Sequence, residues 1–266
     1  MDLGLAGRRV LVTGSWRGTG AAIAECVARE GARVLVHGLE SGQNEAVCDR
    51  LREDSLDVAG VTGDITTDAG SQVLIDECLS HWGGLDVLIN NYGVAEGGDW
   101  TSTPTEEWVG IYQKNVLSGV RLVHGFAPGM RERGEGRIIF VGTVGSLRPN
   151  SRMPHYYASK AVLPNLCVSL AKELRGSGIT VNVVSPGVIG TSEVKAMLRS
   201  RAQKRGYGDD DEALSRAAAE VFDSPLGRIA ELEEVASVVA FLASTQAAYI
   251  NGANIRVDGG ASDCAV

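Results

Sequence analysis

Short runs of aliphatic and β-branched residues alternate with longer, helix-like segments along the chain, and only a few fold classes accommodate such an alternation. The first run, RRVLVTG at 8–14, precedes a segment at 21–31 in which Ile23 and Val27 share one helical face and Gly31 marks the end. Further strand-like runs lie at 32–38, 57–64, 85–91, 136–143, 178–187 and 253–260. These repeated β-α-β units predict an α/β fold, with a mostly parallel sheet of seven strands and helices on both faces.

The segments between these runs have the length and periodicity of helices. Helices are predicted at 42–53, 68–82, 105–133, 155–175, 191–224 and 234–244. The pattern at 105–133 indicates a broken helix, and the charged segment 191–224 has a flexible tip at 204–212. Because no linker, low-complexity stretch or repeat divides the sequence, we expect one domain over 1–266.

Net charge and cysteine usage narrow the range of partners. The chain has 25 basic and 33 acidic residues, a net charge of −8, which argues against nucleic acid or an anionic membrane as the main partner. No apolar run reaches the roughly 18 residues of a membrane-spanning helix, and the N-terminal segment does not resemble a signal peptide. The five cysteines are scattered without a C-x-x-C pair, so no metal site is predicted and a reduced, cytoplasmic location is expected.

A glycine-rich turn, VLVTGSWRGTG, follows the first strand. Gly14, Gly18 and Gly20 stand between this strand and the first helix, where glycines allow a tight turn, a close approach of the backbone to a pyrophosphate, and tight packing. The start of the helix offers free N–H groups and the positive end of its dipole to phosphates. Similar turns occur in loops that bind nothing, but this one lies at the carboxyl edge of the sheet, where open α/β sheets bind ligands. It favours a doubly wound, Rossmann-type domain that binds a dinucleotide.

The segment HYYASK presents two candidate acid/base residues. Tyr156 lies four positions before Lys160 and Tyr157 lies three, so either phenol can share a helical face with the ammonium group. A nearby ammonium group lowers the pKa of a phenol from its usual value of about 10 and makes it a better proton-transfer group. Spacing alone does not decide between the two tyrosines, and the stretch could also be an ordinary amphipathic helix.

Five features in register carry a family resemblance: TGSWRGTG, NNYG, Asn115, YYASK and SPGVIGT. In this order and at these spacings they resemble the short-chain dehydrogenase/reductase family over residues 9–260. The resemblance implies an NAD(P)-dependent oxidoreductase that interconverts a ketone and a secondary alcohol, both small molecules. It also implies a substrate pocket walled by residues 144–155 and by a substrate-loop segment at about 190–225.

The family pattern Y-x-x-x-K selects Tyr156 as the catalytic acid/base. Lys160 would lower the pKa of that tyrosine and bond the nicotinamide ribose. Members of the family carry a serine thirteen residues before the tyrosine; counting back from Tyr156 gives Thr143, whereas counting from Tyr157 gives a valine without a hydroxyl. Asn115 matches the family asparagine that holds a helix kink and a water of the proton relay.

The same resemblance implies a set of cofactor-binding residues drawn from these motifs. They are Gly14, Ser15, Arg17, Gly18, Thr19, Gly20, Asp64, Ile65, Asn91, Gly93, Tyr156, Lys160, Pro186, Gly187, Ile189 and Thr191. Asp64 matches the acid that accepts from the adenine amino group, and it could also cap the following helix. The Ile189 backbone and the Thr191 side chain would face the carboxamide and the phosphates.

Two positions depart from the family pattern. Thr143 keeps the hydroxyl of the usual serine but adds a methyl group that restricts its rotamers and narrows the pocket. Tyr92 stands where the family has an alanine, so it must point into the cofactor site or against a neighbouring helix. Beside it, Asn90 is expected to tie the central strand to its neighbours.

The end of the second strand bears on the choice of cofactor. NAD-specific relatives place an acid there, which bonds the adenosine ribose. Here that place falls at Gly38, followed by Leu39, with Glu40 one step beyond. Arg17 stands where NADP-binding relatives carry a base that reaches the 2′-phosphate. We therefore expect a modest preference for NADP, with NAD still usable.

Other functions remain compatible with these motifs. Relatives of this kind include epimerases and dehydratases that keep the dinucleotide bound, and the departures at Thr143 and Tyr92 would also suit a catalytically weak regulator. A methyltransferase would leave the Y-x-x-x-K pair unexplained. Members of the family commonly form tetramers through long helices near 105–133 and 156–175 and the last strand, so a homotetramer or a homodimer is expected.

Overall fold

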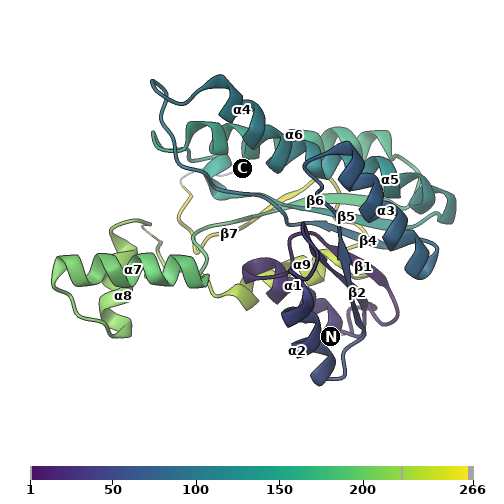
Figure 1. The fold of residues 1–266 in the computed structure, drawn as a ribbon, viewed down its shortest axis with the longest axis horizontal. Helices are drawn as coiled ribbons and strands as arrows, with labels where there is room; N and C mark the ends of the chain where they lie inside the picture. The colour runs from purple at the N-terminus through teal and green to yellow at the C-terminus, as the bar shows by residue number, and fades with distance from the viewer. Residues whose placement is uncertain (1, 223, 263–266) are drawn as a thin grey trace.

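The computed structural model describes residues 2–222 and 224–262 and contains one sheet in the order β3-β2-β1-β4-β5-β6-β7 (Figure 1). The strands are β1 Arg9–Val12, β2 Arg33–Gly38, β3 Val58–Thr62, β4 Val87–Asn90, β5 Gly136–Val141, β6 Ile179–Pro186 and β7 Asn254–Val257. Every neighbouring pair is parallel, as the β-α-β alternation requires. The prediction of a doubly wound, Rossmann-type α/β fold is confirmed.

Helices cover both faces of this sheet (Figure 1). One face carries α1 Gly18–Arg29, α2 Glu45–Glu53 and α9 Leu232–Ala243, and the other carries α3 Asp68–Trp82, α5 Ser118–Arg133 and α6 Pro154–Glu173. Within the described part of the chain, no helix is both long and apolar enough to cross a membrane.

The alternation of side chains along each strand explains the two layers. In β1, Val10 and Val12 belong to the core beneath α1 and α9, whereas Leu11 belongs to the core beneath α3 and α5. The same division separates Val34 from Leu35 in β2. Because both faces are covered, the successive apolar residues 10–12 of β1 and 34–36 of β2 are fully buried.

The strand order reverses between β1 and β4, and this reversal positions the site. The chain runs outward from β1 to β3, then returns to the other side of β1 and runs outward again to β7. Crossovers to opposite sides open a crevice at the carboxyl ends of β1 and β4. Val12 pairs with Ile89 at this edge, so the turn after β1 and the loop after β4 leave the sheet side by side.

The predicted break inside 105–133 is a turn of π-helix. Helix α4 covers Thr105–Tyr112, the π segment η1 covers Gln113–Leu117, and α5 continues from Ser118. Such segments are rare in proteins and often occur at functional sites.

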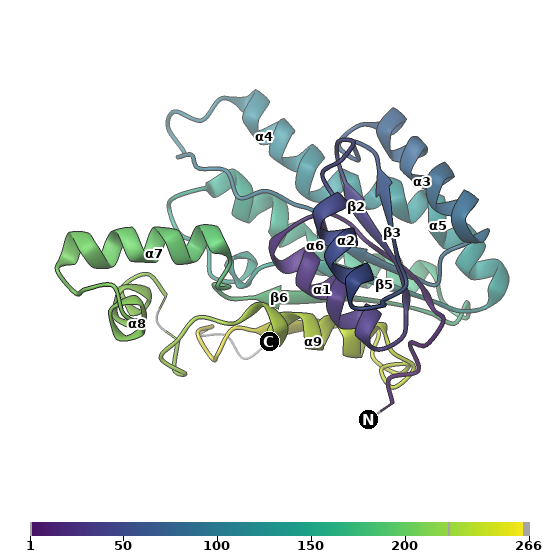
Figure 2. The same ribbon diagram turned by 60° about the horizontal axis from the view of Figure 1, so that its bottom comes forward.

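The charged segment predicted as one helix at 191–224 forms two helices, α7 Ser192–Arg205 and α8 Asp211–Ala219. Gly206, which has a positive φ, ends α7, and the Asp210 side chain caps α8. The two helices pack mainly against each other around Leu198 and Ala202, and both views show them extending away from the sheet (Figures 1 and 2).

Candidate active site

The glycine-rich turn connects β1 to α1 and lies against the loop after β4. Gly14 adopts a positive φ of 61°, which favours glycine. A Cβ at Gly20 would lie 2.4 Å from the Gly14 carbonyl oxygen and 2.5 Å from Asn91 Nδ2, so no larger residue fits there. Among the described residues no side chain caps α1, which leaves the N–H groups at its start for a ligand.

His37, at the end of β2, supports this turn and was not anticipated from the sequence. The Gly14 N–H donates to His37 Nδ1 over 3.0 Å, so Nε2 carries the proton and donates to the Gly63 carbonyl oxygen over 2.9 Å. The His37 ring is completely buried, and burial lowers its pKa to about 4. The only sequence signal was a polar residue within an apolar strand.

Ser15 belongs to the same support and does not line the cavity, contrary to the prediction that it binds cofactor. Its hydroxyl donates to the Val12 carbonyl oxygen over 2.7 Å and accepts from the His37 N–H over 2.8 Å. Its own N–H donates to the His37 carbonyl oxygen. Ser15 is fully buried and stabilises the turn from within.

The loop after β4 is fixed to β1 by Asn91 and not by Asn90. Asn91 Nδ2 donates to the Thr13 and Gly14 carbonyl oxygens over 2.9 and 3.2 Å. The buried side-chain amide of Asn90 has no hydrogen-bond partner among the described residues. The role expected for Asn90, tying the central strand to its neighbours, is therefore filled by Asn91. The sequence could not separate two adjacent asparagines, because their roles depend on which one faces β1.

Tyr92 faces the cofactor side. Its N–H donates to Thr13 Oγ1 over 2.9 Å, its side chain lies against Gly14, and its ring centroid is 6.3 Å from that of Trp16. Burial raises the pKa of Tyr92 to about 12, so the phenol is neutral at physiological pH.

A cavity of about 550 Å³ opens between the glycine-rich turn, the loop after β4 and the start of α6. The predicted cofactor residues that line it are Gly14, Arg17, Gly18, Thr19, Gly20, Asn91, Gly93, Tyr156, Lys160, Pro186, Gly187, Ile189 and Thr191, together with the predicted catalytic Thr143. Its wall also contains residues outside the predicted cofactor-binding set: Trp16, Leu39, Tyr92, Val94, Ala95, Val141, Gly142 and Glu193.

Two predicted cofactor-binding residues, Asp64 and Ile65, do not line this cavity. Ile65 is buried in the core, and the exposed Asp64 accepts from the Thr66 N–H and hydroxyl over 3.0 and 2.7 Å. Thr67 and not Asp64 caps α3, because the Thr67 hydroxyl accepts from the Gly70 N–H. The alternative role considered for Asp64, as the cap of this helix, is therefore wrong.

Tyr156, Thr143 and Lys160 converge on one wall of the cavity. The Tyr156 phenol is hydrogen bonded to Thr143, and the buried Lys160 donates through Nζ to the Val141 carbonyl oxygen over 2.9 Å. Burial lowers the pKa of Lys160 to about 8 and raises that of Tyr156 to about 12. The expected lowering of the Tyr156 pKa by Lys160 is not found in this structure, since burial outweighs the opposing effect of Thr143.

Tyr157 points to a different neighbourhood. Its hydroxyl accepts from Asn150 Nδ2 over 3.0 Å, and its ring lies over Gly145, where a Cβ would come within 2.1 Å of it. Tyr157 does not line the cavity. The structure thus places Tyr156, and not its neighbour, beside Lys160 in the cavity.

Asn115, in the π segment, connects the loop after β4 to α6. Its Oδ1 accepts from the Val94 N–H over 2.8 Å, and its Nδ2 donates to the Val94 carbonyl oxygen and to Ser159 Oγ. A Cβ at Gly93 would lie 2.8 Å from both Asn115 Oδ1 and Lys160 Nζ. Asn115 does not itself line the cavity, but it lies directly behind Gly93 and Lys160.

Comparison with known proteins identifies the family. A family model described as enoyl-(acyl carrier protein) reductase matches residues 14–262. The 3-oxoacyl-[acyl-carrier-protein] reductase FabG of Vibrio cholerae is 36% identical over 97% of this chain and 98% of its own, and the uncharacterised oxidoreductase YvaG of Bacillus subtilis is 34% identical over 98% of both. The chain belongs to the short-chain dehydrogenase/reductase family.

Solved structures of this family of oxidoreductases superimpose closely. The L-sorbose reductase of Gluconobacter frateurii, complexed with NADPH and L-sorbose, is 31% identical with a TM-score of 0.92, over 99% of this chain and 100% of that one. A gluconate 5-dehydrogenase of Burkholderia cenocepacia, in complex with NADP and tartrate, is 26% identical with a TM-score of 0.86, over 99% and 98%.

The burial of His37 generates a prediction about acid stability. Since its pKa is about 4 in the folded chain and about 6.5 when unfolded, the unfolded state binds more protons between these values, and stability falls as the pH is lowered through this window. At about 1.4 kcal/mol per pKa unit, the loss amounts to about 3 kcal/mol of unfolding free energy. Urea denaturation at pH 7 and at pH 4.5 should show that the unfolding free energy falls less between these pH values in His37→Gln than in the wild type. His81→Gln, on the exposed surface of α3, is the control and should behave as the wild type. If the unfolding free energy of His37→Gln falls as much as that of the wild type, another group is responsible for the loss.

Proposed function

We propose that the chain is an NADP(H)-dependent reductase that interconverts a ketone and a secondary alcohol. The observation that carries the proposal is the convergence of Tyr156, Thr143 and Lys160 on the cavity that the glycine-rich turn opens. The cavity also suits the cofactor, because the glycines keep the turn free of side chains that would fill the cradle at the start of α1. When bound there, NADP(H) would supply or accept the hydride.

The charge states of the chain's own residues support the reductive direction. With a pKa of about 12, Tyr156 keeps its proton at neutral pH and can donate it to a carbonyl oxygen, while the Thr143 hydroxyl orients that oxygen. With a pKa of about 8, Lys160 is charged at neutral pH and stabilises the phenolate that forms. Asn115 acts from behind this pair, by holding the loop that contains Gly93.

The cavity wall supports NADP as the preferred cofactor. Leu39 lines the wall at the end of β2, where an acid would select NAD, and the exposed Arg17 lines it within the glycine-rich turn. The Leu39 and Glu40 N–H groups both donate to Gln43 Oε1, which fixes this corner. The sorbose reductase and gluconate dehydrogenase structures described above contain NADPH and NADP.

The substrate side is proposed to be walled by residues 144–155 and by the arm at 190–225, within a single domain. The arm contains α7 and α8, and it begins directly after Pro186 and Ile189, which line the cavity. A small carbonyl compound entering between the arm and Tyr156 would reach Thr143. Consumption of NADPH in step with loss of the ketone distinguishes this reaction from an epimerase, a dehydratase or an inactive regulator.

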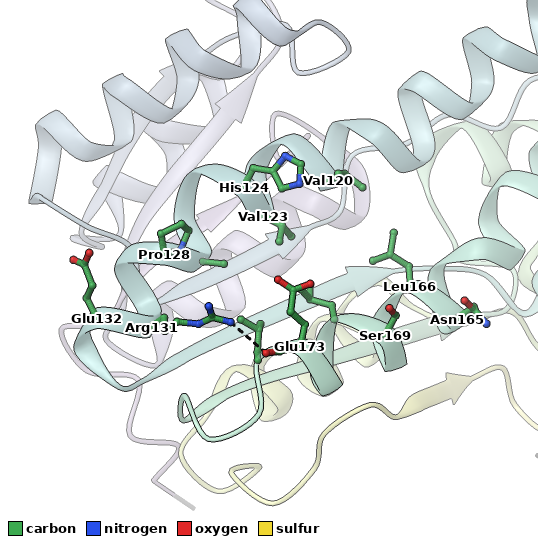
Figure 3. A pocket seen from close by; sticks show the side chains of 13 residues that line it. Val120, Val123, His124, Pro128, Arg131, Glu132, Asn165, Leu166, Ser169 and Glu173 are labelled. Carbon is green, nitrogen blue, oxygen red and sulfur yellow. Dashed lines mark hydrogen bonds between the residues drawn. The ribbon is translucent and has the colours of Figure 1, made fainter.

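The family expectation of a homotetramer, or at least a homodimer, has a structural basis in α5 and α6. A groove between these helices is lined by Val120, Val123, His124, Ala127, Pro128, Arg131, Glu132, Asn165, Leu166, Ser169, Leu170, Glu173 and Leu174 (Figure 3). It combines apolar side chains with both signs of charge: Arg131 donates to the Glu173 carbonyl oxygen over 3.2 Å, and the acidic Glu132 and Glu173 line the groove as well. A patch of this composition can pair with its own copy across a two-fold axis.

Tyr156→Phe removes the proposed proton donor and keeps the ring. Ketone reduction should fall by at least about 10²-fold, the usual size of general acid catalysis. Tyr157→Phe should lower kcat/KM by less than tenfold, because that hydroxyl accepts from Asn150 outside the cavity. Measured kcat/KM values that fall equally in both variants would contradict the assignment.

Arg17→Ala tests the cofactor assignment. A charge-assisted hydrogen bond to the 2′-phosphate contributes about 1.5–3 kcal/mol, or roughly 10- to 150-fold in affinity. The wild type should favour NADP by about tenfold or somewhat more, and Arg17→Ala should remove that preference in the ratio of kcat/KM for the two cofactors. A wild type that prefers NAD, or a ratio that Arg17→Ala leaves unchanged, would refute the assignment.

Ser169→Arg places a bulky charge in the α5–α6 groove and should dissociate the assembly. Light scattering should give four or two copies for the wild type and fewer for the variant. Ser80→Arg makes the same change on the exposed face of α3 and should leave the mass unaltered. A monomeric wild type would overturn the oligomer proposal.

A further inference from the structure

Glu193, in the first turn of α7, lies on the wall of the cofactor cavity and was not indicated by any sequence motif. Its carboxylate accepts from Arg17 Nη1 over 2.5 Å, from the Ser192 hydroxyl over 3.1 Å and from the Thr191 hydroxyl. A hydrogen bond from its own backbone N–H, followed by those from Thr191 and Ser192 and by the charge of Arg17, holds the pKa of Glu193 below its usual value, so the group is an anion at neutral pH. An anion inside a cavity proposed for a phosphate-bearing cofactor needs an explanation.

Two of the donors around Glu193, Arg17 and Thr191, are groups assigned above to the cofactor. Arg17 is the proposed partner of the 2′-phosphate, and Thr191 is the proposed partner of the phosphates. The start of α7 adds the positive end of a helix dipole, which favours an anion at this place. Glu193 therefore bonds two side chains that are proposed to bind phosphate groups of the cofactor.

We propose that Glu193 is an internal substitute for the cofactor phosphate, which holds Arg17 until NADP(H) displaces it. The inference rests on the proposed function, because it requires that Arg17 bind the 2′-phosphate. In this view Glu193 determines cofactor selectivity from α7, since it lowers the affinity for NADP(H) by occupying Arg17. NAD(H), which lacks the 2′-phosphate, does not require Arg17 to change partner.

The exposure of the ion pair limits the size of the effect. The Arg17 and Glu193 side chains are 67% and 57% exposed, and solvent screens such pairs strongly. Exposed pairs of this kind correspond to about a two- to fivefold change in an equilibrium constant. The pair is thus strong enough to occupy Arg17 and weak enough for a phosphate with a larger charge to replace it.

The test measures the binding of NADP⁺ and NAD⁺ by calorimetry in wild type, Glu193→Gln, Arg17→Ala and the double variant. Glu193→Gln should tighten NADP⁺ binding by about two- to fivefold and change NAD⁺ binding less. In the Arg17→Ala background, Glu193→Gln should not increase the affinity for NADP⁺. Glu45→Gln, which also removes a first-turn acid but from α2 and outside the cavity, should leave both affinities unaltered.

The outcomes separate the inference from the proposed function. If Arg17→Ala removes the NADP preference but Glu193→Gln leaves NADP⁺ binding equal or weaker, the substitute role of Glu193 is wrong and the cofactor assignment remains. If Glu193→Gln still increases the affinity for NADP⁺ in the Arg17→Ala background, the inference also fails, because the effect would not depend on Arg17. If Arg17→Ala leaves the preference unaltered, both the assignment and the inference fail. A misfolded Glu193→Gln variant cannot imitate the expected result, which is tighter binding.

Discussion

The contact between the glycine-rich turn and the loop after β4 is the constraint on which the site depends. Asn91 donates to the carbonyl oxygens of Thr13 and Gly14, and Gly20 has no side chain that would separate the two segments. The loop continues through Gly93 and Val94 to Asn115, which in turn bonds Ser159 of α6. The cofactor side and the catalytic side are therefore parts of one continuous hydrogen-bonded structure, and Lys160 and Tyr156 inherit their positions from it.

Burial shifts the pKa values of the titratable groups in this structure. Lys160 and His37 have lowered pKa values and Tyr156 a raised one, each because burial disfavours the charged form. A neutral phenol near an ammonium group is suited to donating a proton, because the ammonium charge stabilises the phenolate that remains. The π segment that holds Asn115 belongs to the same arrangement, because it places the amide between the loop and α6.

Much of the fold and the motif-bearing half of the site could be predicted because they depend on local patterns. Periodicity located the strands, and the glycine and tyrosine motifs located most of the cavity wall. The roles of Ser15, Asn90 and Asp64 could not be read in this way, since each depends on which neighbour from a distant segment lies against it. His37 and Glu193 escaped notice for the same reason: their partners Gly14 and Arg17 are 23 and 176 positions away. Tyr92 was recognised as unusual, but only tertiary structure could show that it faces the cofactor side.

The pairing of α7 with α8 has a consequence for the arm that is proposed to wall the substrate side. These helices enclose a small core of their own around Leu198, Ala202 and Ala217, and they contribute little to the two cores that hold the sheet. Insertions, deletions or replacement within the arm beyond the first turn of α7, which holds Glu193, therefore remove few contacts from the nucleotide-binding half. Evolution can therefore change this segment while the rest of the domain stays the same. A protein engineer can do likewise by grafting the segment from one relative to another.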